Sequence, residues 1–331
     1  MVLVITFFKF HFISFINIMT IKTLYLDKII SDEELETVKG QFLDSGYVHH
    51  FIDYDCDVFD SSTKQFIASF RKKRIKKSHL AWDNFKHLSV ASRGRGASAG
   101  PIDPTSDYWK KRHLIKTSGF RTSYMVKGKV SKMSVNNQVA STPIGFYEKT
   151  KALGFDKPCR LTYHTSQALK QYESGKPYIH ELDRWYKKIR PHEHKIQLDR
   201  SNLKKDFKID HTAFSTITMN RNFRTAVHKD KGDFGHTAVL TCLEHGKYSG
   251  CLFMIPGYGI GIDLRMDDIL VANVGLFHCN SELYTTKEQD EYNASLPKVF
   301  KGNSAVGTVG IYENYSRITM VSYLREKLID C

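Results

Sequence analysis

The chain has 331 residues, enough to bury a sizeable core in one large or two smaller domains. Hydrophobic residues make up 41% of it and aromatic residues 12%, which excludes an intrinsically disordered chain. The formal net charge of +14 at pH 7 favours a polyanionic partner such as nucleic acid over an anionic membrane surface.

The first 18 residues are rich in phenylalanine, isoleucine and valine. Lys9, His11 and Asn17 interrupt this apolar run, and no signal-peptide cleavage site follows it. We therefore expect residues 1–18 to be an extension or a mis-assigned start, with Met19 as the true first residue, rather than a membrane-directed segment.

Residues 19–90 are predicted to form a helical N-terminal region. Ser31 and Glu34 make a capping box ahead of apolar residues at helical spacing. A second helical stretch, expected within 61–92, contains the basic run RKKRIKK (71–77). Such a run fits a solvated face, a phosphate-binding patch or a nuclear address equally well.

Residues 92–107, SRGRGASAGPIDPTSD, have the composition of a loop and lack the G-K-[ST] ending of a P-loop. The glycines allow close backbone approach, and Arg93 and Arg95 favour an anion. Short β-like runs are expected from 119 onward, and residues 178–201 are predicted to form a helix that ends near Pro191.

The final third, residues 207–325, is predicted to be almost entirely strands separated by Gly, Asn and Asp turns. The predicted strands are FSTITMN, HTAVLTCL, GCLFMI, GIGIDL, DILVANVGLFH, AVGTVGIY and RITMVSYL. Many short strands without intervening helices indicate a sandwich, jelly roll or barrel.

A candidate metal site lies within these strands. His228 and Asp230 form an H-x-D pair after FSTITMN, and His278 ends the strand DILVANVGLFH. Two histidines and one carboxylate on a single face are the ligand set of non-haem Fe(II) oxygenases. Arg317, which begins a later strand, is placed to clamp the distal carboxylate of 2-oxoglutarate in bidentate fashion.

The segment 214–325 resembles the TET/J-binding-protein family of Fe(II)- and 2-oxoglutarate-dependent nucleobase dioxygenases, in particular its small phage, viral, protist and algal members. RTAVHKDKGDF, GKYSGCLFMIPGYGIGIDL and RITMVSYL carry the resemblance; RGRGASAG, NNQVASTPIGFYE and RPHEHKIQ extend it upstream to about residue 90. Asp267-Asp268 stands where the family usually has Gly-Asp.

The resemblance implies an α+β fold, with a double-stranded β-helix (jelly-roll, cupin-like) core at about 207–325 and flanking N-terminal helices. It implies a dioxygenase domain over 91–331. His228, Asp230 and His278 would be the catalytic iron ligands, and Arg317 the cosubstrate anchor. Asn222 and Arg224 are predicted as further cosubstrate contacts, although packing roles fit them equally well.

The implied reaction is hydroxylation of the C5-methyl group of a pyrimidine in DNA, with 5-methylcytosine slightly favoured over thymine. DNA would be bound as a base-flipped substrate, and no obligate protein partner is expected. One alternative is a relative that uses ascorbate to attach a glyceryl group to 5-methylcytosine; another is a catalytically inactive, basic nucleic-acid-binding module.

The six cysteines are scattered and include no C-x-x-C pair. Their spacing argues against structural zinc and against a disulfide scaffold. It favours a reducing compartment, so that a nuclear or cytoplasmic location is expected.

Overall fold

The computed structural model describes residues 21–89, 91–92, 95–102, 105, 114–118, 121–130, 137, 139–152, 155–299 and 315–331. The expectations for residues 1–18, for Arg93 and for a strand at 305–312 lie outside these ranges. Within the described part of the chain, no helix is long and apolar enough to cross a membrane.

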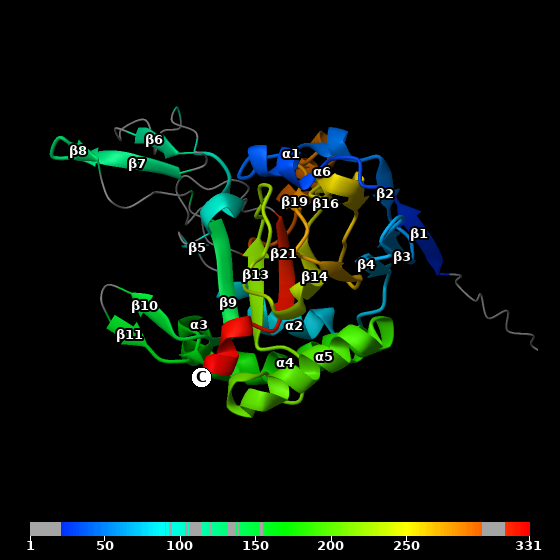
Figure 1. The fold of residues 1–331 in the computed structure, drawn as a ribbon, viewed down its shortest axis with the longest axis vertical. Helices are drawn as coiled ribbons and strands as arrows, with labels where there is room; N and C mark the ends of the chain where they lie inside the picture. Colours follow the sequence, from blue (N-terminus) through cyan, green and yellow to red (C-terminus); the bar gives the residue numbers. More distant parts are fainter. Residues whose placement is uncertain are drawn as a thin grey trace, which may run out of the picture.

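A large mixed sheet forms the centre of the molecule (Figure 1). Its strands run, in spatial order, β1 (Lys22–Leu26), β3 (Cys56–Asp60), β4 (Phe66–Arg71), β18 (Ile269–Asn273), β14 (Thr237–His245), β21 (Ser316–Tyr323), β13 (Thr216–Arg221), β9 (Val139–Tyr147) and β12 (Arg160–Leu161), with β5 (Ala91–Ser92) paired to β9. A smaller sheet contains β19 (Cys279–Asn280), β16 (Phe253–Ile255), β17 (Ile260–Ile262) and β2 (His50–Ile52).

The remaining strands form small antiparallel sheets. They are β6 (Leu114–Ser118) with β7 (Arg121–Val126) and β8 (Lys129–Val130), β10 (Thr150–Ala152) with β11 (Phe155–Lys157), and β15 (Ser249–Gly250) with β20 (Leu283–Tyr284). The helices are α1 (Asp32–Thr37), α2 (Ser78–Phe85), α3 (Tyr163–Gln167), α4 (Leu169–Ile189), α5 (Pro191–Ser201) and α6 (Lys287–Ala294).

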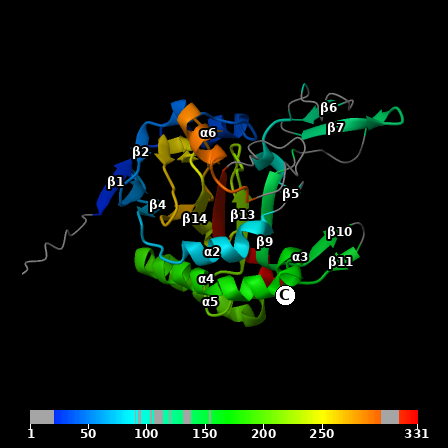
Figure 2. The same cartoon turned by 180° about the vertical axis from the view of Figure 1, so that it is seen from behind.

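The large sheet is covered on both faces by apolar side chains. On one face, Ile318 of β21 and Ile217 of β13 belong to a buried cluster that includes side chains of α2 and α4, and Figure 2 shows these helices from behind. On the other, Phe253 and Ile262 of the small sheet belong to a second cluster with β3, β4, β14 and β18. The order is helices, large sheet, small sheet.

The two faces of strand β21 have different roles. Successive side chains of a strand point to opposite faces, so Ile318 and Met320 enter the cluster on the helical side. Arg317 and Thr319 point to the side of the small sheet, where they line a pocket. The predicted α+β fold with a double-stranded β-helix core is confirmed, and its pocket lies between the two sheets.

The N-terminal region differs from the prediction. Although α1 carries the predicted capping box of Ser31 and Glu34, residues 19–90 also contribute β3 and β4 to the large sheet and β2 to the small one. This region is therefore part of the core and not a separate helical unit. The helices that flank the sheet include α4 and α5 from the middle of the chain as well as α2.

The basic run 71–77 is likewise not helical: Arg71 ends β4, and residues 72–77 connect this strand to α2. Arg71 is buried and paired with Asp57, and Arg74 is paired with Asp55. The backbone N–H groups of Lys76 and Lys77 donate to the carboxylate of Glu181. Much of the run is thus occupied by internal contacts.

Two further details differ from the sequence-based expectations. The predicted helix end near Pro191 is confirmed, since α4 ends at Ile189, but Pro191 also begins a second helix, α5, which was not predicted. Cys159 and Cys331 form a disulfide bond, which their 172-residue separation in the sequence gave no reason to expect.

Candidate metal centre

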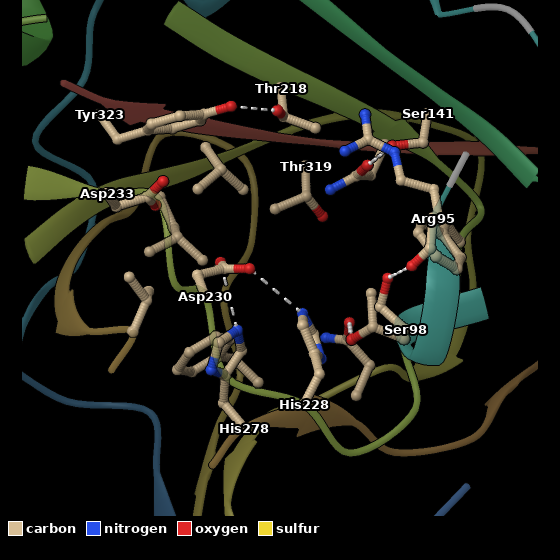
Figure 3. Close-up of a pocket in the computed structure, with 18 of the residues that line it drawn as sticks. Arg95, Ser98, Ser141, Thr218, His228, Asp230, Asp233, His278, Thr319 and Tyr323 are labelled. Atoms are coloured by element: carbon tan, nitrogen blue, oxygen red, sulfur yellow. Dashed lines mark hydrogen bonds and ion pairs between the residues drawn. The ribbon is translucent and has the colours of Figure 1, made fainter. Parts of the chain in front are cut away.

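Three side chains converge at one end of the pocket, as Figure 3 shows. His228 and Asp230 lie in the loop that follows β13, and His278 directly precedes β19. One ligand atom from each of the three lies within 4.8 Å of the others. Asp230 approaches both imidazoles, with its oxygens 3.8 Å from Nε2 of His228 and 3.6 Å from Nε2 of His278.

Both imidazole rings are oriented by the backbone behind them. Nδ1 of His228 lies 2.7 Å from the carbonyl oxygen of Ala226, and Nδ1 of His278 lies 2.9 Å from that of Leu276. Since a carbonyl only accepts, each Nδ1 carries the hydrogen and each Nε2 presents its lone pair to the centre. This is the arrangement that partners of metal-binding histidines impose.

The loop that carries the ligands is fixed by main-chain hydrogen bonds. The N–H of His228 donates to the carbonyl of His278 at 3.1 Å, and the N–H of His278 donates back at 2.9 Å. The N–H of Asp230 donates to the carbonyl of Val274 at 3.0 Å. The relative positions of the three ligands are therefore set by the folded chain itself.

His278 is well suited to bind a cation as a neutral ligand. The residue is 5% exposed. Burial, and after it the neighbouring His228, lowers the pKa of His278 to about 4. At neutral pH its Nε2 lone pair is available to a metal without first losing a proton.

Arg317 meets the requirements for an anion clamp. It is 2% exposed and lines the same pocket as the three ligands, a cavity of about 270 Å³. Its Nη1 donates to the hydroxyl of Thr319. Its Nε and Nη2 are buried and have no hydrogen-bond partner among the residues the structure describes. Unsatisfied buried donors are costly, so these two nitrogens fit a bound carboxylate.

Asn222 lies beside Arg317 but does not line the pocket. Its side-chain oxygen accepts from the N–H of Arg317 at 2.7 Å, and its amide donates to the carbonyl of Tyr315 at 3.1 Å. Its backbone N–H donates to the carbonyl of Arg317 at 2.8 Å. Asn222 therefore holds the backbone of the clamp, which corrects its predicted role as a cosubstrate contact.

Arg224 is also outside the pocket lining. Its Nη2 donates to the carbonyl of Leu43 at 2.7 Å, and its guanidinium lies 4.8 Å from the ring centroid of Phe42. The predicted cosubstrate contact of Arg224 is not supported, because its guanidinium is directed to the N-terminal segment.

The pocket wall also contains polar residues that were not selected from the sequence. Asp233 and Tyr323 lie there (Figure 3). Arg325, which also lines the pocket, pairs with both carboxylate oxygens of Glu148. Its guanidinium lies 4.2 Å from the ring centroid of Tyr147. An even number of positions separates Arg325 from Arg317. Because alternate side chains of an extended chain point to the same side, this spacing could have identified Arg325 from the sequence.

Arg95, for which an anion was expected, also points into the pocket (Figure 3). It comes from the glycine-rich loop, and Ala226 of the ligand-bearing segment donates its N–H to the carbonyl of Ser98 in that loop at 3.0 Å. The loop predicted to bind an anion is therefore part of the pocket wall.

Comparison with known proteins places the chain among oxygenases. The family model Tet_JBP, the oxygenase domain of the 2OGFeDO superfamily, matches residues 142–326. A JBP2 of Leishmania infantum, named a bifunctional helicase and thymine dioxygenase, is 34% identical over 125 residues, 38% of this chain and 11% of that protein. A JBP1 of Trypanosoma brucei brucei, named a thymine dioxygenase, is 32% identical over 159 residues, 48% of this chain and 19% of that protein.

This chain thus spans less than a fifth of the length of these curated relatives. Among solved structures, NgTET1 in complex with 5mC DNA superimposes with a TM-score of 0.46 at 10% sequence identity. The superposition covers 84% of this chain and 78% of that one.

Proposed function

This chain belongs to the Tet_JBP family of oxygenase domains in the 2OGFeDO superfamily, and on that premise we propose that it hydroxylates the C5-methyl group of a pyrimidine in DNA, using Fe(II) and 2-oxoglutarate. One observation carries the proposal. Two Nε2 atoms and a carboxylate oxygen lie within 4.8 Å of one another, in a pocket that is also lined by a buried arginine with two donors that have no partner among the described residues.

Different residues of the pocket would hold the metal and 2-oxoglutarate. His228, Asp230 and His278 would bind the metal, and Arg317 with Thr319 would bind the distal carboxylate of 2-oxoglutarate. When bound, Fe(II) and 2-oxoglutarate supply the oxidant from O2, which inserts one oxygen atom into a C–H bond as 2-oxoglutarate is converted to succinate and CO2. Asn222 positions the clamp by bonding to both the N–H and the carbonyl of Arg317.

DNA is the proposed substrate because the chain carries 49 Lys and Arg residues against 35 Asp and Glu residues, an excess that suits a polyanion. A methyl group inside a duplex cannot reach a pocket between two sheets. The target nucleotide must leave the base stack, at a cost of a few kcal/mol that contacts in the pocket offset. The ring of Tyr147 at the pocket wall offers one surface for stacking.

Of the two methylated pyrimidines, we propose 5-methylcytosine as the preferred base. The carboxyl of Asp233 lines the pocket next to the metal ligands. Burial and the nearby Asp230 raise its pKa well above the ordinary value. The carboxylate form only accepts hydrogen bonds, whereas the protonated form also donates one, so reading of cytosine requires the ionised form. The N4-amino group of cytosine is a donor, whereas O4 of thymine is an acceptor. The relatives named thymine dioxygenases make thymine the competing substrate.

The test is anaerobic reconstitution with Fe(II), followed by O2, 2-oxoglutarate and duplex DNA that contains both thymine and 5-methylcytosine. Digested nucleosides are analysed by mass spectrometry beside a His228→Ala/Asp230→Ala control. A nucleoside that gains one oxygen with the wild type alone supports the proposal and identifies the base. No modified base and no succinate would refute the 2-oxoglutarate reaction, and a parallel incubation with ascorbate tests the glyceryl-transfer alternative.

A further inference from the structure

A segment outside the family match lies directly behind the metal ligands. The backbone N–H of Gly40 donates to the carbonyl of Val227 at 2.9 Å, and the N–H of Val227 donates to the carbonyl of Gln41 at 3.0 Å. Val227 immediately precedes the ligand His228. Residues 40 and 41 therefore hold the main chain from which the first ligand extends, although the family model begins only at residue 142.

Apolar packing joins the same segment to both ligand-bearing strands. Leu35 and Leu43 belong to a buried cluster with Val227, Phe277 and Cys279. Val227 and Phe277 each precede a histidine ligand, and Cys279 follows the second one. The N-terminal segment thus packs against the residues next to both histidines.

An ion pair completes this support at the turn between the ligands. Lys229 stands between His228 and Asp230 in the sequence. Its Nζ lies 2.9 Å from a carboxylate oxygen of Asp32, the first residue of α1, and 4.3 Å from the ring centroid of Phe277. The side chain of Lys229 is thereby held between α1 and the residue preceding His278.

A partly exposed ion pair contributes little to global stability, about 0–1 kcal/mol. With side-chain exposures of 26% for Lys229 and 41% for Asp32, the pair is not explained by stability. Because Lys229 stands between two ligands, the pair is placed to fix the orientation of these ligands. Groups that orient metal ligands affect metal affinity strongly.

We propose that Asp32 is a positioning residue of the metal centre, which acts through Lys229 to fix the turn that carries His228 and Asp230. This inference rests on one part of the proposed function, namely that the three residues bind a divalent metal. It assigns a role in that site to the N-terminal segment, residues 28–44.

The experiment is an anaerobic titration of metal-free full-length protein with Co(II), followed by the visible absorbance of the bound ion. The variants are Asp32→Asn, Lys229→Met and the double variant, with His228→Ala as the reference for loss of the site. Asp199→Asn is the matched control, because Asp199 forms an exposed i,i+4 pair with Lys195 at 2.6 Å on α5.

Each single variant is expected to weaken Co(II) binding about tenfold, the lower end of the range for groups that orient metal ligands. The double variant should bind no more weakly than Asp32→Asn, since both single changes remove the Lys229–Asp32 contact and Asp32→Asn also removes the pair of Asp32 with Lys28 at 2.6 Å. Asp199→Asn should match the wild type. Thermal unfolding of the metal-free Asp32→Asn protein should stay within about 3 °C of the wild type.

Wild-type Co(II) affinity in Asp32→Asn would overturn the inference, as would a further loss in the double variant or an equal loss in Asp199→Asn. If Asp32→Asn does not fold, Lys229→Met decides alone: unchanged affinity overturns the inference, and a tenfold loss supports it. A wild type that binds Co(II) no better than His228→Ala refutes the metal centre, and with it the proposed function, before any other variant is compared.

Discussion

Replacing Arg317 by lysine tests the cosubstrate clamp most directly. Lysine keeps the positive charge but cannot present two parallel donors to a carboxylate. In the structure Nε and Nη2 of Arg317 are buried without a partner among the described residues, so at least one charge-assisted hydrogen bond to 2-oxoglutarate is lost. Such a bond is worth about 1.5–3 kcal/mol, which corresponds to a rise in the KM for 2-oxoglutarate of about 10- to 150-fold.

Succinate formation at varied 2-oxoglutarate, with DNA and Fe(II) saturating, measures this KM. Arg224→Lys is the matched control, because Arg224 donates to the carbonyl of Leu43 and lies outside the pocket lining. Its KM should remain within about twofold of the wild type, since about 0.4 kcal/mol corresponds to a factor of two. An unchanged KM in Arg317→Lys, or an equal rise in both variants, would refute the assignment of the clamp.

Three further predictions follow from other parts of the structure. Asp233→Ala should lower kcat/KM for 5-methylcytosine by about 10- to 150-fold, the loss of one strong hydrogen bond, and leave thymine within about threefold; equal losses on both bases would contradict base reading by Asp233. Gly145→Ala should lower the free energy of unfolding in urea by about 2–4 kcal/mol, because Gly145 has a φ of +89° and an added Cβ would lie 2.5 Å from the carbonyl oxygen of Ser215; a loss below about 1 kcal/mol would show that the strand adjusts. Cys159→Ser should cost about 2–4 kcal/mol in the absence of a reductant, and dithiothreitol should lower the melting temperature of the wild type but not of the variant; a wild type insensitive to dithiothreitol would argue against the disulfide in solution.

The ligand set could be found in the sequence because its signals are local. His228 and Asp230 are two residues apart at a strand end, His278 ends a later predicted strand, and Arg317 begins the last one. The structure brings all four to one pocket. The short, apolar strands separated by turn residues indicated a sandwich, jelly roll or barrel, and the family resemblance specified the double-stranded β-helix.

The remaining roles depend on pairings between distant segments. Asn222 accepts a hydrogen bond from Arg317, which lies 95 residues later in the sequence. The sequence alone does not show this pairing, and it therefore could not distinguish a residue that supports Arg317 from one that contacts the cosubstrate. The basic run after β4 resembled a helix because lysine and arginine are good helix formers. Two contacts with a distant segment override that preference. β4 pairs with β18, and the backbone N–H of Lys73 donates to the carboxylate of Asp268, 195 residues away in the sequence.

The mutual backbone hydrogen bonds of His228 and His278 bear on which ion the protein carries. Because the peptide chain holds these ligands at a fixed spacing, they are already assembled before any ion binds. The protein then has no assembly step that could exclude a wrong ion. Selection then follows intrinsic affinity, and for nitrogen and oxygen ligands Co(II), Ni(II) and Cu(II) all exceed Fe(II). We therefore expect the supply of metal in the surroundings to decide how many molecules hold iron, and nickel or copper to compete with iron for the site.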